Sequence, residues 1–100
     1  MSKKKPVDSQ TSQPTFRYPK FSPQFLDDLA WWCKTDRNKI DKIFELVTDT
    51  VLHPFEGLGK PEPLKHSEAN TWSRRIDLEN RLVYRISHER IDFLQARYHY

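Results

Sequence analysis

The first half of the chain carries apolar residues at helical spacing. Ser22 is a preferred N-cap residue and Pro23 suits the first helical position, so a helix is predicted over residues 23–34. A second helix is predicted to follow a cap at Thr35 or Asp36. The apolar stripes are Phe25, Leu26, Leu29 and Trp32 in the first helix, and Ile40, Ile43, Phe44, Val47 and Val51 in the second. Two such helices in succession predict a hairpin whose stripes form core.

Loops and short strands are predicted after the second helix, which Pro54 ends. Both glycines of the chain, Gly57 and Gly59, lie in the connection that follows, which favours close backbone approach. Antiparallel strands are predicted at residues 64–66, 72–78, 81–87 and 90–98. A further short strand is predicted within residues 15–21, where Pro19 removes an amide donor and confines the strand to a sheet edge.

Side chains alternate along a strand, which assigns them to the two faces of the sheet. The face of the 81–87 strand expected to pack on the helices consists of Leu82, Tyr84 and Ile86. Arg75 and Arg81 are expected to converge on the opposite, open face, where a sheet covered by helices on one side receives a ligand. Arg74 does not fit the assignment of charged side chains to the open face, because alternation places it among the core residues.

A chain of 100 residues holds one compact domain. Residues 1–14 are polar and lack apolar periodicity, which predicts a flexible tail ahead of a single domain at residues 15–100. Cys33 is the only cysteine, so no internal disulfide is possible. The lysines at positions 3–5 precede no apolar run, and no stretch of about 18 apolar residues could span a membrane. These features predict a cytoplasmic protein without membrane contact.

Charge is divided unevenly between the two halves of the chain. Residues 21–56 carry seven acids against four bases, whereas residues 60–100 carry eight bases against six acids. Six of those eight bases are arginines, whose forked guanidinium suits bidentate phosphate contact. The second half is therefore expected to face a polyanion. A solvated surface with scattered ion pairs is the other interpretation of the same pattern.

Two titratable residues of the second half are candidates for acid–base chemistry. Glu62 lies between Pro61 and Pro63, which narrow its backbone freedom. His99 precedes the C-terminal residue, whose carboxylate favours the imidazolium. A base and an acid facing each other across a phosphate would serve a ribonuclease that needs no metal. On these residues alone, a solvated glutamate and a surface histidine remain the alternative interpretations.

Four runs of residues occur in an order that resembles a known family. They are PFEGLGKPEPLKH (54–66), WSRRI (72–76), NRLVY (80–84) and ARYHY (96–100). Together they resemble the YoeB/Txe branch of the RelE/ParE toxin superfamily, over roughly residues 21–100. The resemblance implies an α+β, RelE-like fold with two N-terminal helices packed on one face of a small, mostly antiparallel sheet. It also implies the toxin of a type II toxin–antitoxin system, an mRNA endoribonuclease that acts on the translating ribosome and inhibits translation.

The resemblance also assigns roles to individual residues. The implied catalytic residues are Glu62 as general base, His99 as general acid, Arg81 as the phosphate-stabilising cation and Tyr100 as a terminal residue that orders the site. Lys65, His66 and Arg75 match further residues that bind RNA or stabilise charge. The implied products are a 2′,3′-cyclic phosphate and a 5′-hydroxyl. The implied partners are a cognate antitoxin of the YefM type and the translating ribosome with its rRNA and A-site mRNA, and a toxin dimer is left open.

Two other classes of function stay open at this point. A ParE-like inhibitor of DNA gyrase shares the fold without cutting RNA, although the combination of Glu62, Arg81 and His99 argues against it. A non-catalytic RNA-binding module is the third class. No metal or cofactor is predicted, because the cysteine and histidines lack paired ligand spacing and the chain has neither a glycine-rich phosphate loop nor an aspartate cluster.

Overall fold

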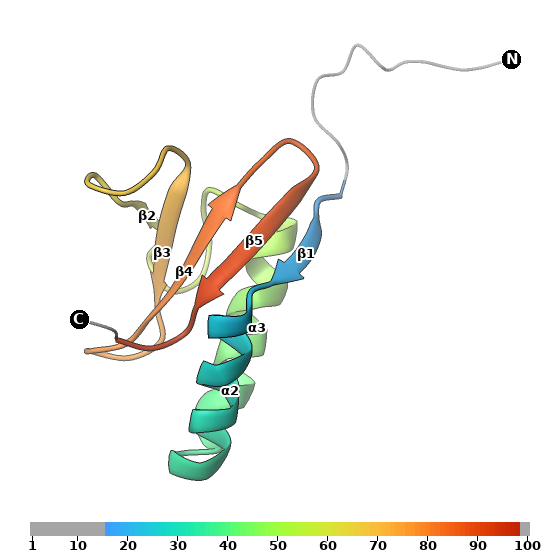
Figure 1. Cartoon of the computed structure of the whole chain (residues 1–100). Coiled ribbons are helices and arrows are strands. Elements are labelled where there is room, and N and C mark those ends of the chain that lie inside the picture. Colours follow the sequence, from blue (N-terminus) through green and yellow to red (C-terminus); the bar gives the residue numbers. More distant parts are fainter. Residues whose placement is uncertain (1–15, 99–100) are drawn as a thin grey trace, which may run out of the picture.

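The computed structural model describes residues 16–98 of the chain. Its elements are, in chain order, β1 (Tyr18–Phe21), α2 (Pro23–Thr35), α3 (Asn38–Leu52), β2 (Glu62–Pro63), β3 (Thr71–Arg75), β4 (Arg81–Ile86) and β5 (Arg90–Gln95). The two helices form a hairpin that packs against a five-stranded sheet (Figure 1). The tail predicted at residues 1–14 lies outside the described residues. No helix in the described part of the chain is long and apolar enough to cross a membrane.

α2 begins as its sequence predicts. The Ser22 hydroxyl accepts a hydrogen bond from the Phe25 N–H at 3.1 Å, and Pro23 occupies the first turn. Phe25 and Trp32 are buried, whereas Leu26 of the predicted stripe is 53% exposed. The cap therefore fixes the point where the chain leaves β1 and turns its aromatic side chains toward the sheet.

α3 begins later than its sequence predicts. Thr35 is still part of α2, and Arg37 occupies the N-cap position of α3 without a side-chain cap bond. The Asp36 carboxylate accepts only the Asn38 N–H, at 3.2 Å. The predicted cap at Thr35 or Asp36 is thus wrong, because the first helix continues up to the residue expected to begin the second.

The buried face of α3 is rotated relative to the predicted stripe. Ile43 and Val47 are buried as expected, but Phe44 is 44% exposed. Leu46 and Thr50 are fully buried in its place. Because residues three and four apart share a helix face, this set forms one continuous face, and Phe44 lies to its side.

The sheet has the order β1-β5-β4-β3-β2. β1 runs parallel to β5 and all other neighbours are antiparallel, which confirms the mostly antiparallel sheet. Pro19 lies in β1, at the edge of the sheet, as predicted. Its missing amide therefore breaks no hydrogen-bond ladder in the centre of the sheet. The opposite edge is wrongly predicted, since residues 64–66 are not a strand. The pairing belongs instead to Glu62 and Pro63, which lie opposite Ser73 and Trp72.

All four strands predicted after α3 end earlier in the structure, β4 by one residue at Ile86 and the other three where turns follow them. The Leu64 N–H donates to the Thr71 carbonyl at 2.9 Å, and the chain turns at the next residue. Leu64 therefore does not extend β2. β3 stops at Arg75, since the next residue donates its N–H to the Asn80 carbonyl at 2.9 Å. β5 stops at Gln95, where the chain bends toward α2.

The predicted faces of the central strands are confirmed. Leu82 and Tyr84 are fully buried, and Ile86 is nearly so. Arg75 lies directly opposite Arg81 in the register of β3 and β4, so both project from the open face. The open face therefore carries two arginines side by side on neighbouring strands.

Aromatic rings join the core face of the sheet to the first helix. The Phe93 ring on β5 lies 6.0 Å from Phe25 of α2 and 6.1 Å from Tyr84 of β4, between ring centroids. Phe21 of β1 stacks on both phenylalanines, at 5.1 Å from Phe25 and 5.6 Å from Phe93. These contacts seat α2 on the face opposite the paired arginines.

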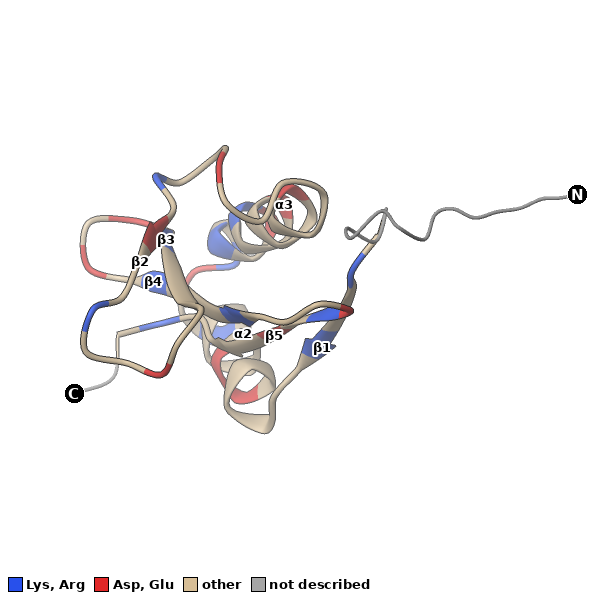
Figure 2. Ribbon diagram, turned by 90° about the horizontal axis from the view of Figure 1, so that it is seen from above, with Lys and Arg blue, Asp and Glu red and all other residues tan. Residues whose placement is uncertain are grey.

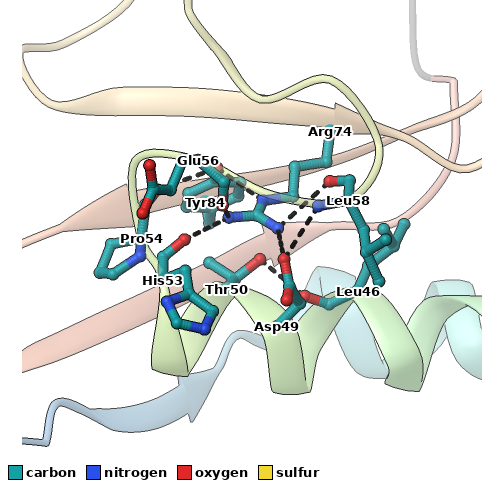
Figure 3. Close-up of polar contacts among 9 residues, drawn as sticks. All are labelled: Leu46, Asp49, Thr50, His53, Pro54, Glu56, Leu58, Arg74 and Tyr84. Atoms are coloured by element: carbon teal, nitrogen blue, oxygen red, sulfur yellow. Dashed lines mark hydrogen bonds and ion pairs between the residues drawn. The ribbon is translucent and has the colours of Figure 1, made fainter.

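Arg74 lies on the core side of β3, and its side chain is fully buried. Figure 3 shows its guanidinium pointing at the end of α3 and at the α3–β2 loop (residues 53–61). Nη1 contacts the Asp49 carboxylate at 2.6 Å, and Nε donates to the Tyr84 hydroxyl at 3.1 Å. The guanidinium also donates to the carbonyls of His53, Glu56 and Leu58, at 2.6, 2.8 and 3.2 Å. The charge that alternation places in the core is therefore fully hydrogen-bonded.

Two glycines allow the α3–β2 loop to approach this guanidinium. Gly57 has φ 113°, and a Cβ there would collide with the Asp49 carboxylate. Gly59 has φ 78°, in the region that favours glycine, and its carbonyl accepts the Arg75 N–H at 2.7 Å. The loop that leads into β2 is thus held between α3 and β3.

The buried cluster keeps one titratable group charged and another neutral. Desolvation raises the pKa of Asp49, but hydrogen bonds from the Leu58 N–H and from Arg74 outweigh it and hold the pKa below its ordinary value. Burial raises the pKa of the Tyr84 phenol, against the opposing effect of Arg74. Asp49 is therefore ionised and Tyr84 protonated around neutral pH.

Replacing Asp49 by asparagine is expected to destabilise the fold at neutral pH, because the buried guanidinium loses its counter-charge. Removing one partner of a buried pair costs about 3–5 kcal/mol, and partial exposure of Asp49 places the loss toward the lower end. The pKa of Asp49 is lower in the folded protein than the value of 3.8 taken for the unfolded chain. The stability that the Asp49 charge contributes is therefore fully present above pH 3.8 and is lost as the pH falls through the pKa of the folded state. Urea unfolding at a series of pH values measures it.

In that series, the gap between wild type and Asp49→Asn should close below about pH 4. Glu45→Gln, an exposed change in the middle of the same helix, is the matched control and should alter the free energy of unfolding by less than about 0.5 kcal/mol. A gap that stays constant down to about pH 3 would contradict the assigned role of the Asp49 charge.

Candidate active site

β2 brings Glu62 to the edge of the open face. Its Oε2 lies 3.2 Å from Nη1 of Arg81 on β4, and the same nitrogen donates to the Ser73 hydroxyl at 3.0 Å. Ser73 is the register partner of Glu62 and belongs to β3, the strand between β2 and β4. Backbone pairing across three strands therefore sets the position of the carboxylate relative to the guanidinium.

This ion pair is accessible to solvent. The Glu62 side chain is 55% exposed and the Arg81 side chain 38% exposed. Exposed pairs of this kind stabilise a fold by only about 0.2–1 kcal/mol. The arrangement is more informative chemically: a guanidinium can hold an anionic ligand, and an accessible carboxylate beside it can take a proton from that ligand.

An open cleft of about 430 Å³ lies beside Arg81. Its lining includes Leu64 and Ser67 after β2, Arg81 and Val83 on β4, and Arg97 and Tyr98 after β5. The volume is within the range of small-molecule sites, about 300–1,000 Å³. The cleft therefore lies between Arg81 of the ion pair and Arg97 and Tyr98, the last residues that the structure describes.

The chain after β5 is tied to α2 and to the β3–β4 turn. Asp28 Oδ2 accepts the Ala96 N–H at 2.8 Å, and Trp32 Nε1 donates to the Ala96 carbonyl at 2.7 Å. The Asn80 side-chain oxygen accepts the Tyr98 N–H at 2.8 Å. In Figure 1 the red end of the chain accordingly runs beside the orange turn between β3 and β4.

The residues that directly precede the C-terminus are also positioned by a ring. The Arg97 guanidinium lies 3.7 Å from the centroid of the half-buried Trp31, a cation–π contact. Tyr98 lines the cleft. His99 and Tyr100, predicted as general acid and as ordering residue, lie outside the described residues. Their roles stay predictions, and the described chain ends at the cleft in which those roles would be exercised.

The remaining predicted site residues fall into two groups. Glu62 and Arg81 are brought together, and Arg75 is the register partner of Arg81. Lys65 and His66 are exposed in the turn after β2, and neither is among the residues that line the cleft. Their expected part in RNA binding therefore stays a prediction.

Lys60 has an unusual backbone conformation two residues before Glu62. Its φ of 54° lies in the left-handed region, and Pro61 follows it. This region costs a non-glycine residue about 1–2 kcal/mol, and a following proline disfavours it further. Strain of this kind persists only where the surrounding structure holds it, as the Arg75 hydrogen bond to Gly59 does here.

The second half of the chain, as far as the structure describes it, carries both paired and unpaired cations. Figure 2 shows basic and acidic segments interleaved along the sheet, so the second half of the chain is not uniformly basic. Its ion pairs join Glu62 to Arg81, Glu68 to Arg85, and Asp92 to Arg85 and Arg90. Among the described residues, Lys60, Lys65 and Arg75 have no carboxylate partner. Nowhere in residues 16–98 do three His, Cys, Asp or Glu side chains gather as metal ligands.

Sequence reasoning missed three residues that position the site. Ser73 and Asn80 carry no signal of their own, since their contacts depend on strand register and on the path of the C-terminal segment. Asp28 does carry one: it is a carboxylate three residues after Phe25 and four before Trp32, on the buried face of α2. An acid at such a position requires a buried donor, and the Ala96 N–H supplies it.

Trp32→Phe is expected to loosen the segment after β5, because the buried Ala96 carbonyl loses its donor. An orphaned buried acceptor costs about 1–3 kcal/mol. Urea unfolding and amide hydrogen exchange of residues 96–98 measure the loss. Trp31→Phe on the same helix is the control, since it retains a ring for Arg97 and breaks no hydrogen bond described here. Equal stability and exchange in the two variants would refute the anchoring role.

Comparison with known proteins assigns the chain to a family. A family described as YoeB-like toxin of bacterial type II toxin-antitoxin system matches residues 21–100. Toxin YoeB of Escherichia coli K12 is 48% identical over 80 residues, which cover 80% of this chain and 95% of that protein. The structure of a YoeB dimer from Staphylococcus aureus is similar with a TM-score of 0.76 at 36% identity, covering 84% of this chain and 98% of the other.

A second solved structure from the same organism is a YoeB-YefM complex. Its similar chain superposes with a TM-score of 0.74 at 35% identity, and the match covers 84% of this chain and 98% of that one. The family match over residues 21–100 includes both helices and the strands β2 to β5. The chain therefore belongs to the YoeB family of toxins from bacterial type II toxin–antitoxin systems.

Proposed function

We propose that this YoeB-family toxin is a metal-independent endoribonuclease that cuts messenger RNA on the translating ribosome and so inhibits translation. The observation that carries the proposal is the accessible pairing of Glu62 with Arg81 beside the cleft that Tyr98 also lines. A base and an anion-binding cation are thereby held at the edge of one open face. The acid of the reaction is assigned to His99, which follows Tyr98 directly.

RNA supplies its own nucleophile in the proposed reaction. Glu62 takes the proton from a 2′-hydroxyl, whose oxygen attacks the adjacent phosphorus. The bond from phosphorus to the 5′-oxygen breaks, and the His99 imidazolium gives its proton to that oxygen. The products are a 2′,3′-cyclic phosphate and a 5′-hydroxyl, with one proton gained by Glu62 and one lost by His99.

Arg81 is assigned to the phosphate. Without RNA, its guanidinium is shared by Glu62 and Ser73. A bound phosphate competes with Glu62 for the guanidinium and leaves the carboxylate free to act as base. By analogy with an oxyanion donor, such a cation accelerates the reaction about 10²–10³-fold. Arg75, Lys65 and His66 are assigned to RNA binding, and Tyr100 to ordering the site.

The partners of the chain are proposed on two grounds. A YefM-type antitoxin and a toxin dimer are proposed because YoeB from Staphylococcus aureus was solved in both assemblies. The ribosome, with its rRNA and A-site mRNA, is proposed because Lys60, Lys65 and Arg75 of the second half have no carboxylate partner among the described residues. A cleft of about 430 Å³ holds only a short piece of RNA, so these cations are assigned to phosphates of a folded rRNA surface outside it.

Induction of the toxin in bacteria should produce new 5′ ends within translated messages. Primer extension maps these ends, and polynucleotide kinase labels them directly because they carry a 5′-hydroxyl. Glu62→Gln and His99→Ala should each lower cleavage by about 10²–10⁴-fold. Their matched controls, Glu89→Gln and His88→Ala in the exposed β4–β5 turn, should cut at the wild-type rate.

Each alternative gives a different result in the same experiment. Ends that carry a 5′-phosphate would exclude 2′-hydroxyl attack. Arrest of growth with DNA breaks and without new RNA ends would identify a gyrase inhibitor, and translation arrest without new ends would identify an RNA-binding module. Cutting of a message whose start codon is removed would exclude dependence on translation.

Metal independence can be tested without dissociating the ribosome. An mRNA with a phosphorothioate at the cleavage point slows an enzyme whose metal ion binds the replaced oxygen, and Mn²⁺ or Cd²⁺ then restores the rate. We expect no restoration by either ion, because the proposed transition state is stabilised by Arg81 alone. Restoration by a thiophilic ion in either sulfur diastereomer would overturn this part of the mechanism.

A further inference from the structure

A second open pocket is lined by the start of the β3–β4 turn together with parts of α3 and of the α3–β2 loop. Its volume is about 420 Å³, within the range of ligand sites of about 300–1,000 Å³. Three cations line it: Lys42 of α3, Lys60 of the α3–β2 loop and Arg75 of β3. Three elements that are distant in sequence thus direct positive charge at one space. Neither of the described residues assigned to catalysis, Glu62 and Arg81, lines this pocket.

The positive charge of the pocket is not neutralised within the described residues. Lys42, Lys60 and Arg75 make no ion pair with any described carboxylate. The one acid in the lining, Asp77, contacts Lys39 at 3.2 Å and accepts the N–H groups of its own turn. Desolvation raises the pKa of Asp77, but these hydrogen bonds lower it below its ordinary value. Asp77 is therefore ionised and already engaged elsewhere.

The pocket is continuous with the site through two residues. Arg75 is the register partner of Arg81, so the two guanidinium groups project from neighbouring strands on the same face. Leu78 lines both this pocket and a second hollow beside Arg81, and its side chain is 99% exposed. An extended chain lying on Arg81 can therefore pass over Arg75 and Leu78 into the pocket.

We propose that the pocket of Lys42, Lys60 and Arg75 is a subsite for the backbone phosphate of a nucleotide that flanks the cleavage point in single-stranded RNA. The inference rests on the proposed function and adds to it a second anchoring point. The cations bind the phosphate, and the exposed Leu78 offers an apolar surface to the neighbouring sugar or base. Two anchors on one strand fix its direction across the open face, which a single phosphate contact cannot do.

The strained conformation of Lys60 provides a variant that separates binding from folding. Glycine adopts φ 54° without steric cost, so Lys60→Gly removes the cation and relieves the backbone. Lys42→Ala removes the second cation, and Lys34→Ala, an exposed lysine on α2 that lines none of the three hollows described, is its matched control. Thermal unfolding shows which variants are folded before binding is measured.

The test measures binding of a short, fluorescent single-stranded RNA whose 2′-hydroxyls are methylated and which therefore cannot be cut. Fluorescence anisotropy over a range of KCl concentrations gives the slope of log K against log [KCl]. Each lost phosphate contact should reduce the magnitude of that slope by about 0.7. We expect this reduction and a several-fold weaker affinity at low salt for Lys42→Ala and Lys60→Gly, with Lys34→Ala unchanged.

A scan with single methylphosphonate linkages then locates the phosphate. At one position beside the cleavage point, the neutral linkage should weaken binding to wild type but not to Lys42→Ala or Lys60→Gly. The subsite is refuted if folded Lys42→Ala and Lys60→Gly bind the RNA as wild type does, even where wild type cuts mRNA as proposed. If instead wild type fails both to bind this RNA at low salt and to cut translated messages, the subsite and the proposed function fall together.

Discussion

The buried guanidinium of Arg74 is the contact on which the arrangement of the functional face depends. One side chain on β3 binds the Asp49 carboxylate, the Tyr84 hydroxyl and three carbonyls at the end of α3 and in the loop that follows. A buried charge of this kind is costly unless every donor is used, and here the backbone of an irregular loop supplies most of the acceptors. These hydrogen bonds hold the loop in one conformation. An apolar residue in place of Arg74 would make no such bonds and would not favour that conformation.

The consequence of this contact appears at β2. A strand of two residues with a proline has few ladder hydrogen bonds of its own, so its position depends on how the preceding loop delivers it to the edge of the sheet. Delivered there, Glu62 meets Arg81 across the intervening strand, and Ser73 holds the guanidinium between them. Arg74 and Arg75 are adjacent in sequence and serve opposite faces: the first holds the loop in the core, and the second lies on the surface that we assign to RNA.

The C-terminal segment depends on a different element. Asp28 and Trp32 of α2 bind both polar groups of Ala96, so the first helix of the chain fixes the segment that leads to His99. Glu62 and the described end of the chain are therefore positioned by separate parts of the structure: Glu62 by α3 and its loop, and residue Ala96 by α2.

Local signals in the sequence determined much of this protein, because they depend on neighbouring residues alone. Ser22-Pro23 predicts the start of α2, and alternation predicts the faces of β4. The four motifs identify the family, and two of them contain Glu62 and Arg81. The tertiary structure decided the rest. The cap of α3 depends on how far the preceding helix continues. The exposure of Phe44, the edge strand at Glu62–Pro63 and the hydrogen bonding of Arg74 depend on segments distant in sequence, whose contacts no local pattern records.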